Sequence, residues 1–264
     1  MASLASSLPR ALLTPSLYAN VHNIWFQGVA PNSKIASREV MTRWFGQGSP
    51  EDRRAFDETC SKEFAAALES IGPDNFPLPP ALNFHEESAA AASIAAPLMK
   101  NINNTTDDET KSSQALALVL LLDQIPRNIF RTRQAVIYTH YDRLARAVLR
   151  NIMSSDPRLD MHSSLRLAPA RRMWFYMPLM HSEYIEDHET YIKVVSEMQA
   201  EFRQHGDKQS EDYVGWSLDS EKKHKHLIER FGRYPYRNAQ LGRTLTKEEE
   251  EYLQSGGEDF GTAA

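Results

Sequence analysis

Cysteine is almost absent from this chain of 264 residues, since Cys60 is the only one. A single cysteine excludes an intramolecular disulfide and a zinc cage built from cysteines, and it is typical of a reducing compartment. No hydrophobic run approaches the roughly 18 residues that a membrane-spanning helix needs. We therefore expect a cytoplasmic protein with no membrane partner.

A large excess of charge of one sign is also missing, because the formal net charge is only −5. This balance argues against nucleic acid as a partner. The glycine-rich phosphate loops and nucleophile-elbow motifs that mark many cofactor and hydrolase sites are absent as well, so we expect no cofactor. The composition, 41% hydrophobic and 25% charged, is that of an ordinary globular domain.

Acidic residues are absent from the first 38 positions, where serine is frequent and Arg10 lies among leucine and alanine. This composition resembles a mitochondrial transit peptide, but Arg10 is the only basic residue before Lys34. We expect residues 1–20 to be an N-terminal extension, either disordered or a weak transit peptide. Mitochondrial import is the alternative to the cytoplasm.

No segment alternates in the way a β-strand does, and the punctuation is that of helices. Ser49 and Pro50 form an N-cap and first helical position, followed by a buried stripe of Phe56, Cys60, Phe64 and Leu68. Thr106–Glu109 reads as a capping box that opens a helix through the apolar run 116–122, which Pro126 must end or kink.

Further helices are expected at 133–153, 165–177, 182–205 and 211–231, with Gly232 as the C-terminal cap. Thr246–Glu249 is a second capping box that begins a terminal helix. We expect an all-α fold, with one domain at 21–256 and a tail at 257–264. Residues 72–106, which are rich in proline and alanine, are expected to be a partly mobile insertion with a short helix at Ala89–Ala96.

Two segments concentrate arginine, namely LLDQIPRNIFR at 121–131 and RFGRYPYRNAQLGR at 230–243. Guanidinium groups match carboxylates and phosphates, so these segments are candidates for an anion site. The alternative is structural. Asp123 would pair with Arg127 inside the core, and Arg237 and Arg243 would bridge to Glu248 or Asp142 as a clasp. The candidate ligand contacts are Arg127, Asn128, Arg131, Arg233, Arg237, Asn238 and Arg243.

Histidines beside carboxylates supply candidate acid–base groups. His181 precedes Ser182, a candidate N-cap, and Glu183, and a nearby carboxylate can orient or activate an imidazole. The candidate catalytic residues are His181, Glu183, His224 and Asp123. A metal site is not expected, because His224 and His226 would point about 200° apart on a helix.

These motifs closely resemble the domain-of-unknown-function 924 family of bacteria and fungi, over about residues 20–255. The resemblance is carried by the DQxPRN element at 123–128, MPLMHSE at 177–183, and FGRxPxRNxxLGR at 231–243. It implies a tetratricopeptide-like fold of stacked antiparallel helices, with no established activity. The segments 1–20 and 83–110 look less like the family.

Three hypotheses about function follow. The first is a soluble helical module that binds an anionic small molecule or an acidic peptide through its arginines. The second is an enzyme that uses a histidine–carboxylate pair on a phosphate- or carboxylate-bearing metabolite. The third is a purely structural arginine network, with partners bound elsewhere. The sequence gives no indication of an oligomeric state.

Overall fold

The computed structural model describes residues 12–260, and in this range the chain is all-α and contains no strand. Residues 1–11 of the expected extension and 261–264 of the expected tail lie outside the described residues. The α-helices are α1 (Pro15–Trp25), α2 (Arg38–Trp44), α3 (Pro50–Ser70), α4 (Phe84–Asn103), α5 (Asp108–Asp123), α6 (Ile125–Ile129), α7 (Gln134–Val136), α8 (Asp142–Ser154), α9 (Ser163–Arg166), α10 (Pro169–Arg172), α11 (Met177–Met180), α12 (Ile185–Gln204), α13 (Lys208–Phe231) and α14 (Lys247–Gln254).

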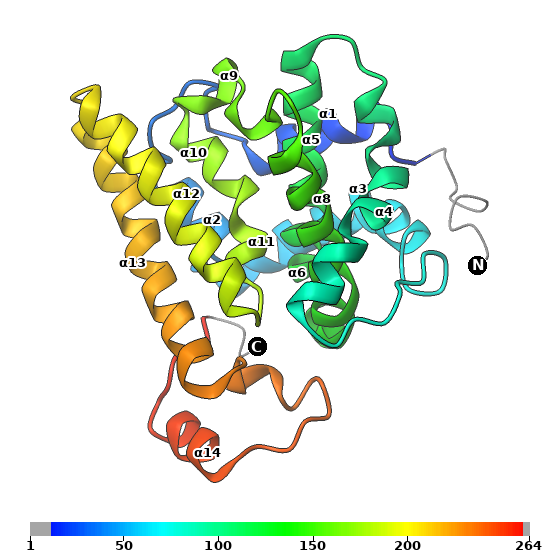
Figure 1. Ribbon diagram of the computed structural model, residues 1–264, viewed down its shortest axis with the longest axis vertical. Coiled ribbons are helices and arrows are strands. Elements are labelled where there is room, and N and C mark those ends of the chain that lie inside the picture. The colour runs from blue at the N-terminus through cyan, green and yellow to red at the C-terminus, as the bar shows by residue number, and fades with distance from the viewer. Residues whose placement is uncertain (1–11, 261–264) are drawn as a thin grey trace.

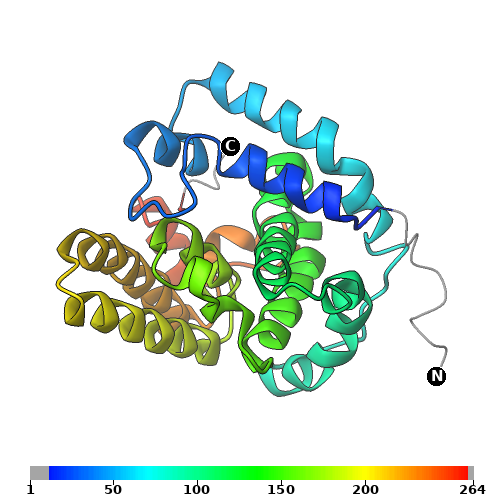
Figure 2. The same cartoon turned by 90° about the horizontal axis from the view of Figure 1, so that it is seen from above.

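Helix α5 lies at the centre of the fold, with α1, α3, α4 and α8 packed around it (Figures 1 and 2). All of its residues from Ala115 to Asp123 are buried, as expected for a helix that is apolar on every side. The predicted capping box at Thr106 is wrong, because the N-cap is Asp107, whose carboxylate accepts the backbone N–H of Thr110 at 2.8 Å.

The proline after α5 acts as predicted. Helix α5 ends at Asp123, and Pro126 lies in the first turn of α6, where its missing N–H is not needed. This break lets two polar side chains, Asp123 and Arg127, emerge at the end of the central helix.

The alanine-rich part of 72–106 forms α4, which has twenty residues and is therefore longer than the short helix expected at Ala89–Ala96. It packs along α8 and buries the side that carries Ala91, Ile94, Leu98 and Ile102. Small residues let the two helices approach closely, so this segment is part of the core. At the other end of the chain, α1 begins at Pro15, inside the expected boundary of the N-terminal extension.

Two of the predicted helices are divided. The single helix expected at 165–177 is wrong, because Pro169 begins a short helix, α10, and a 3₁₀ turn follows at Met173–Phe175. Another short helix, α11, then begins at Met177 with Pro178 in its first turn. The helix expected at 133–153 contains a π-helical turn at Ile137–Tyr141 before α8 begins.

Helices α12 and α13 form a long antiparallel pair along one side of the molecule (Figure 1). The predicted N-cap at Ser182 is wrong, since α12 begins at Ile185 and Tyr184 occupies the cap position without a side-chain hydrogen bond. Gly232 ends α13 in the left-handed conformation with φ 68°, as predicted.

The segment after Gly232 turns back beneath α12 and α13 and ends with α14 (Figure 1). The predicted capping box of Thr246 and Glu249 is formed. A small second apolar cluster holds this segment to the end of α13, formed by Leu227, Ile228 and Tyr234 with partly buried Phe231, Tyr252 and Phe260 packed against them.

Candidate functional site

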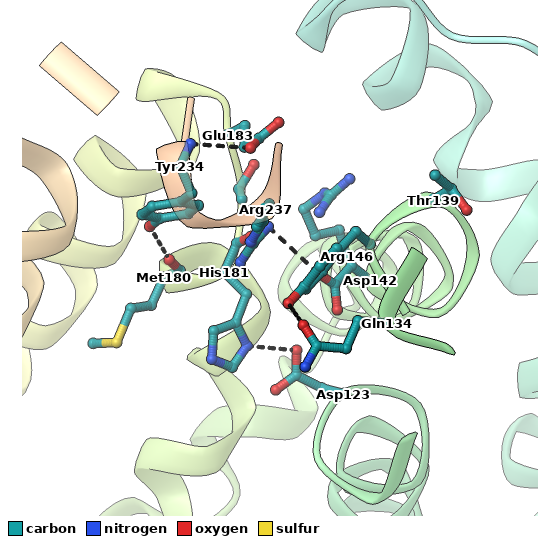
Figure 3. A network of polar contacts seen from close by, with 12 residues as sticks. Asp123, Gln134, Thr139, Asp142, Arg146, Met180, His181, Glu183, Tyr234 and Arg237 are labelled. Atoms are coloured by element: carbon teal, nitrogen blue, oxygen red, sulfur yellow. Dashed lines mark hydrogen bonds and ion pairs between the residues drawn. The ribbon is translucent and has the colours of Figure 1, made fainter. Parts of the chain in front are cut away.

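Five charged or titratable side chains from five separate segments meet where α5 ends. Figure 3 shows Asp123, Asp142, His181 and Arg237 among them. Asp123 is the last residue of α5, Arg127 lies in α6, and Asp142 is the first residue of α8. His181 follows α11, and Arg237 ends a 3₁₀ turn after α13. We call these five residues the His181 centre.

The imidazole of His181 is held by Asp123. Its Nδ1 lies 2.9 Å from Oδ1 of Asp123, whose side chain is completely buried, and Gln124 donates to Oδ2 of the same carboxylate at 2.6 Å. A carboxylate only accepts hydrogen bonds, so Nδ1 carries the proton and Nε2 is left with its lone pair. The sequence named both residues as candidates, and the structure brings them together.

The pKa values of this pair shift in the direction that keeps the histidine neutral. Burial and the charge of Arg127 lower the pKa of His181, and together they outweigh the carboxylate of Asp123. Burial opposes a charge on Asp123, but its interaction with His181, the positive charge of Arg127 and the hydrogen bond from Gln124 hold the pKa of its carboxyl below the usual range. At neutral pH the pair is therefore a neutral imidazole beside a carboxylate.

The two arginines of the centre share one carboxylate. Nη2 of Arg127 lies 2.9 Å from Oδ1 of Asp142 and 3.7 Å from Oδ1 of Asp123. Arg237 donates from Nη1 to the backbone carbonyl of His181 at 2.9 Å, and the same atom lies 3.8 Å from Oδ2 of Asp142. Nη1 of Arg127 and Nε of Arg237 are buried without a hydrogen-bond partner. Both carboxylate oxygens of Asp142 are likewise buried without a hydrogen-bond partner, so capacity is left over on donors and acceptors of the centre alike.

Tyrosine rings enclose the Arg237 guanidinium. Its Cζ lies 4.4 Å from the ring centres of both Tyr138 and Tyr234, and 5.7 Å from that of Tyr236. Tyr138 belongs to the π-helical turn, a local distortion that is frequent at functional sites. Burial raises the pKa of Tyr138 to about 12, so its hydroxyl keeps its proton at neutral pH. Sequence analysis missed Tyr138, because nothing in its neighbourhood indicates a π turn.

Glu183 fastens the segment after α13 to this centre from outside. Its Oε1 accepts the backbone N–H of Tyr234 at 3.0 Å, and its carboxylate pairs with Arg243 at 2.8 Å. The Tyr234 hydroxyl donates to the carbonyl of Met180 at 2.6 Å (Figure 3). Glu183 and Arg243 thus lie next to the centre, and their contacts are those of a clasp.

Other arginines named from the sequence are engaged elsewhere. Arg131 binds Asp57 of α3 through two hydrogen bonds, at 2.5 and 3.0 Å. Arg233 binds Glu249 of α14 in the same bidentate manner, and that hydrogen bond lowers the pKa of the Glu249 carboxyl to about 2.

Of the clasp expected for this segment, the pair of Arg237 and Asp142 is present at 3.8 Å. The partner expected for Arg243 is wrong, because Arg243 pairs with Glu183, while Glu248 pairs with Arg230.

The two asparagines named as ligand contacts face their own segments. Asn128 donates to the backbone carbonyl of Gln124 at 3.2 Å. Asn238 belongs to the segment that follows α13 and is fully buried, and its backbone carbonyl accepts the N–H of Arg243 at 2.9 Å. Both contacts stabilise local turns.

His224 lies apart from the Asp123–His181 pair in its contacts. Its Nδ1 donates to the carbonyl of Ser220 at 2.9 Å, and its ring stacks on Phe260 at 3.5 Å. Burial lowers the pKa of His224 to about 3. Among the described residues, no group of three or more His, Cys, Asp or Glu side chains is placed to hold a metal ion.

Sequence analysis missed a buried ion-pair network between three helices. Glu87 of α4 accepts two hydrogen bonds from Arg146 of α8, at 2.6 and 2.8 Å, and Arg150 of α8 binds Asp187 of α12 at 2.8 and 3.0 Å. Arg143 lies 3.4 Å from Glu87. The available signal was the spacing of the three arginines, which places them on one face of a helix.

The fold and the centre define an all-α protein with a buried histidine–carboxylate–arginine cluster. Over residues 21–257 the chain matches the model of a family described as "Bacterial protein of unknown function (DUF924)", and it belongs to that family. Among solved structures it is similar to the "Structure of Protein of Unknown Function ATU0120 from Agrobacterium tumefaciens". The two are 24% identical with a TM-score of 0.55, and the match covers 91% of this chain and 98% of the other. At this identity the likeness shows the fold alone.

No curated protein matches the chain. Within residues 12–260, no helix combines the length and the apolar character needed to cross a membrane.

Proposed function

We propose that this protein binds a small anionic molecule at the His181 centre. The observation that carries the proposal is the buried Nη1 of Arg127, which has no hydrogen-bond partner although it lies beside a histidine whose Nδ1 is committed to Asp123. A buried guanidinium donor without a partner is costly, and an oxygen of a bound anion would satisfy it.

The centre is open to solvent only at its edge. The side chain of His181 is 16% exposed and that of Arg127 is 23% exposed, whereas Asp123 and Asp142 are buried. An edge this small would suit a small carboxylate or phosphate better than an acidic peptide. Most of the other arginines pair with carboxylates of the same chain, which supports a structural role for them.

The charges of the centre indicate how an anion would enter. Two arginines balance two aspartates, and His181 is neutral because its pKa is lowered. A monoanion would leave a net negative charge in a buried place unless His181 took up a proton at the same time. We therefore expect one proton to bind with each anion, and affinity to rise as the pH falls from 8 toward 6.

The test is a thermal-shift screen with inorganic phosphate, phosphometabolites and organic acids, followed by calorimetry of the hits in two buffers of different ionisation enthalpy. A ligand at 100 times its Kd stabilises a protein by about 2.7 kcal/mol, which a melting curve resolves. Binding should require Arg127, be lost in Arg127→Gln and persist in Arg131→Gln, whose parent arginine pairs with Asp57. A ligand that binds both variants equally, or a screen without a ligand, would contradict the proposal.

Acid–base catalysis at the same centre is the second candidate, and the 2.9 Å contact between His181 and Asp123 favours it. The carboxylate would fix the tautomer, and Nε2 would accept a proton from a substrate held by Arg127. For any substrate found, Asp123→Asn should lower kcat by about 10²–10⁴-fold, the range that general base catalysis contributes. An unchanged kcat would leave binding alone as the function.

Two finer features of the protein belong to this proposal. The antiparallel pair of α12 and α13 supports the tetratricopeptide-like stacking that the family resemblance implies, for that pair of helices. The free and buried Cys60 supports a reducing compartment such as the cytoplasm.

A further inference from the structure

A buried histidine–carboxylate pair joins the two longest helices of one side of the molecule. His188 lies in α12 and Glu221 in α13, which run antiparallel to each other (Figure 1). Nδ1 of His188 is 2.6 Å from Oε1 of Glu221, and Nε2 of His188 is 2.9 Å from the backbone carbonyl oxygen of Ser182. Both side chains are 0% exposed, so solvent does not screen either contact.

The two contacts fix the number of protons that the pair holds. A carbonyl oxygen only accepts hydrogen bonds, so the proton of the Ser182 contact lies on Nε2 of His188. A neutral imidazole has no second N–H, and its bare Nδ1 would place a lone pair against a carboxylate oxygen at 2.6 Å. A proton must therefore lie between Nδ1 and Oε1. Whichever of the two atoms carries it, the pair has no net charge.

The surroundings of Glu221 explain why this proton is retained. Its Oε2 is buried without a hydrogen-bond partner, so an ionised carboxylate would depend on the His188 contact alone. A buried charge with so few hydrogen bonds is costly. Burial accordingly raises the pKa of the Glu221 carboxyl and outweighs both the His188 contact and the charge of Lys225.

The other ionisable groups that face the pair leave its proton count unchanged. Burial raises the pKa of Tyr191 on α12 and of Tyr234 after α13, and it lowers the pKa of His224 on α13, so these three are neutral near pH 7. Lys225 and Glu229 of α13 pair with each other at 2.7 Å. His188 and Glu221 therefore set the proton count by themselves.

The carbonyl that His188 binds belongs to the loop between α11 and α12, directly after His181. We propose that His188 and Glu221 form a proton-dependent latch that ties this loop to α13. The latch involves no side chain of the His181 centre and does not depend on the function proposed there.

The latch makes folding depend on pH. In the unfolded chain above about pH 6.5, a histidine is neutral and a glutamate is ionised, so the separate groups hold one proton fewer than the folded pair. Folding therefore takes up one proton in this range. The stability that the latch contributes is fully present at about pH 6 and is lost as the pH rises above 6.5.

Urea unfolding of the full chain at pH 7.5 and pH 8.5 tests the latch with the variant Glu221→Gln. A glutamine amide can donate to Nδ1 while Nε2 still donates to Ser182, so the variant keeps both hydrogen bonds and loses the extra proton. Over this pH unit the folding equilibrium constant of the parent should fall about tenfold more than that of Glu221→Gln. Glu189→Gln, next to His188 in the sequence but exposed, is the control and should keep the pH dependence of the parent. An equal pH dependence in the parent and Glu221→Gln would overturn the proposal.

NMR of the histidine-labelled parent tests the same proton without a substitution. At pH 7.5 the Nε2 resonance of His188 should be that of a protonated nitrogen. The Nδ1 resonance should be that of a nitrogen that is protonated or strongly hydrogen-bonded. The resonance of a bare lone pair at Nδ1 would overturn the latch, even if Glu221→Gln does not fold.

Discussion

Individual buried histidines make the stability of this protein fall in acid. Burial is the largest cause that lowers the pKa of His22, His140, His181 and His224, the last to about 3. A lowered pKa means that the folded chain stays neutral while the unfolded chain takes up a proton below about pH 6.5. Each of these residues therefore contributes stability near neutral pH that is lost as the pH falls below 6.5.

For His224 the size of the effect can be stated. At pH 5 the loss is about 2 kcal/mol, since each pH unit below 6.5 and above the folded pKa costs about 1.4 kcal/mol. The unfolding free energy of the parent should decrease between pH 7.5 and pH 5. In His224→Leu this decrease should be smaller by about 2 kcal/mol. Urea denaturation at the two pH values measures it. His226→Leu, two residues away and exposed, is the control, and an equal decrease in His224→Leu and the parent would contradict the burial argument.

Contacts between residues of the centre were only partly predictable from the sequence. The spacing of four between Asp123 and Arg127 indicated their contact, because it lies within one short stretch of chain. His181 is 58 positions from Asp123 in the sequence, and Arg237 is 56 positions from His181. These residues meet only because of how α11 and the segment after α13 pack. Such contacts follow from tertiary structure, and local spacing does not carry them.

At the scale of single elements, the ends of helices were predicted where a side chain or a glycine dictates the backbone. The capping residues Ser49 and Thr246 and the left-handed Gly232 are examples. Two helices that sequence analysis expected to be continuous were wrong. Pro169 and a 3₁₀ turn divide the one expected at 165–177, and a π turn interrupts the one expected at 133–153 before α8 begins. Apolar periodicity continues through such breaks, because the same face of the segment is still buried.

Gly232 offers a test of this reasoning. Its φ of 68° is costly for residues with a Cβ, and a Cβ added there would meet no atom within 4 Å. Gly232→Ala should therefore destabilise the protein by about 1 kcal/mol through the backbone alone. Gly232→Asn should cost less, because asparagine tolerates the left-handed region. Thermal or urea unfolding measures both, and an alanine variant as stable as the parent would show that α13 ends differently.

At the scale of the whole molecule, buried ion pairs join helices that are distant in the sequence. Glu87 of α4, Arg146 and Arg150 of α8, and Asp187 of α12 connect three helices on one side of α5. Sequence analysis predicted the all-α class and the central position of α5, because composition and hydrophobic runs carry that information. It missed this network, because Glu87 lies in an alanine-rich segment that was expected to be an insertion.

Removal of one charge from this network should be costly. In Glu87→Gln the arginines of α8 lose their buried counter-charge, and breaking a buried pair in this way costs about 3–5 kcal/mol. Glu58→Gln, at an exposed position of α3, should change the unfolding free energy by less than about 0.5 kcal/mol. Chemical denaturation of the two variants compares them directly. Similar small losses in both would mean that the network contributes little to holding α4, α8 and α12 together.

The central claim is that an anion and a proton bind together at His181. It is tested most directly by NMR titration of the His181 imidazole in the free protein and with the anion that stabilises the protein most. The account predicts that His181 titrates below 6.5 in the free protein and that the bound anion raises its pKa by at least about one unit, equivalent to a tenfold linkage of the two equilibria. A pKa that does not move when the anion is bound would contradict it.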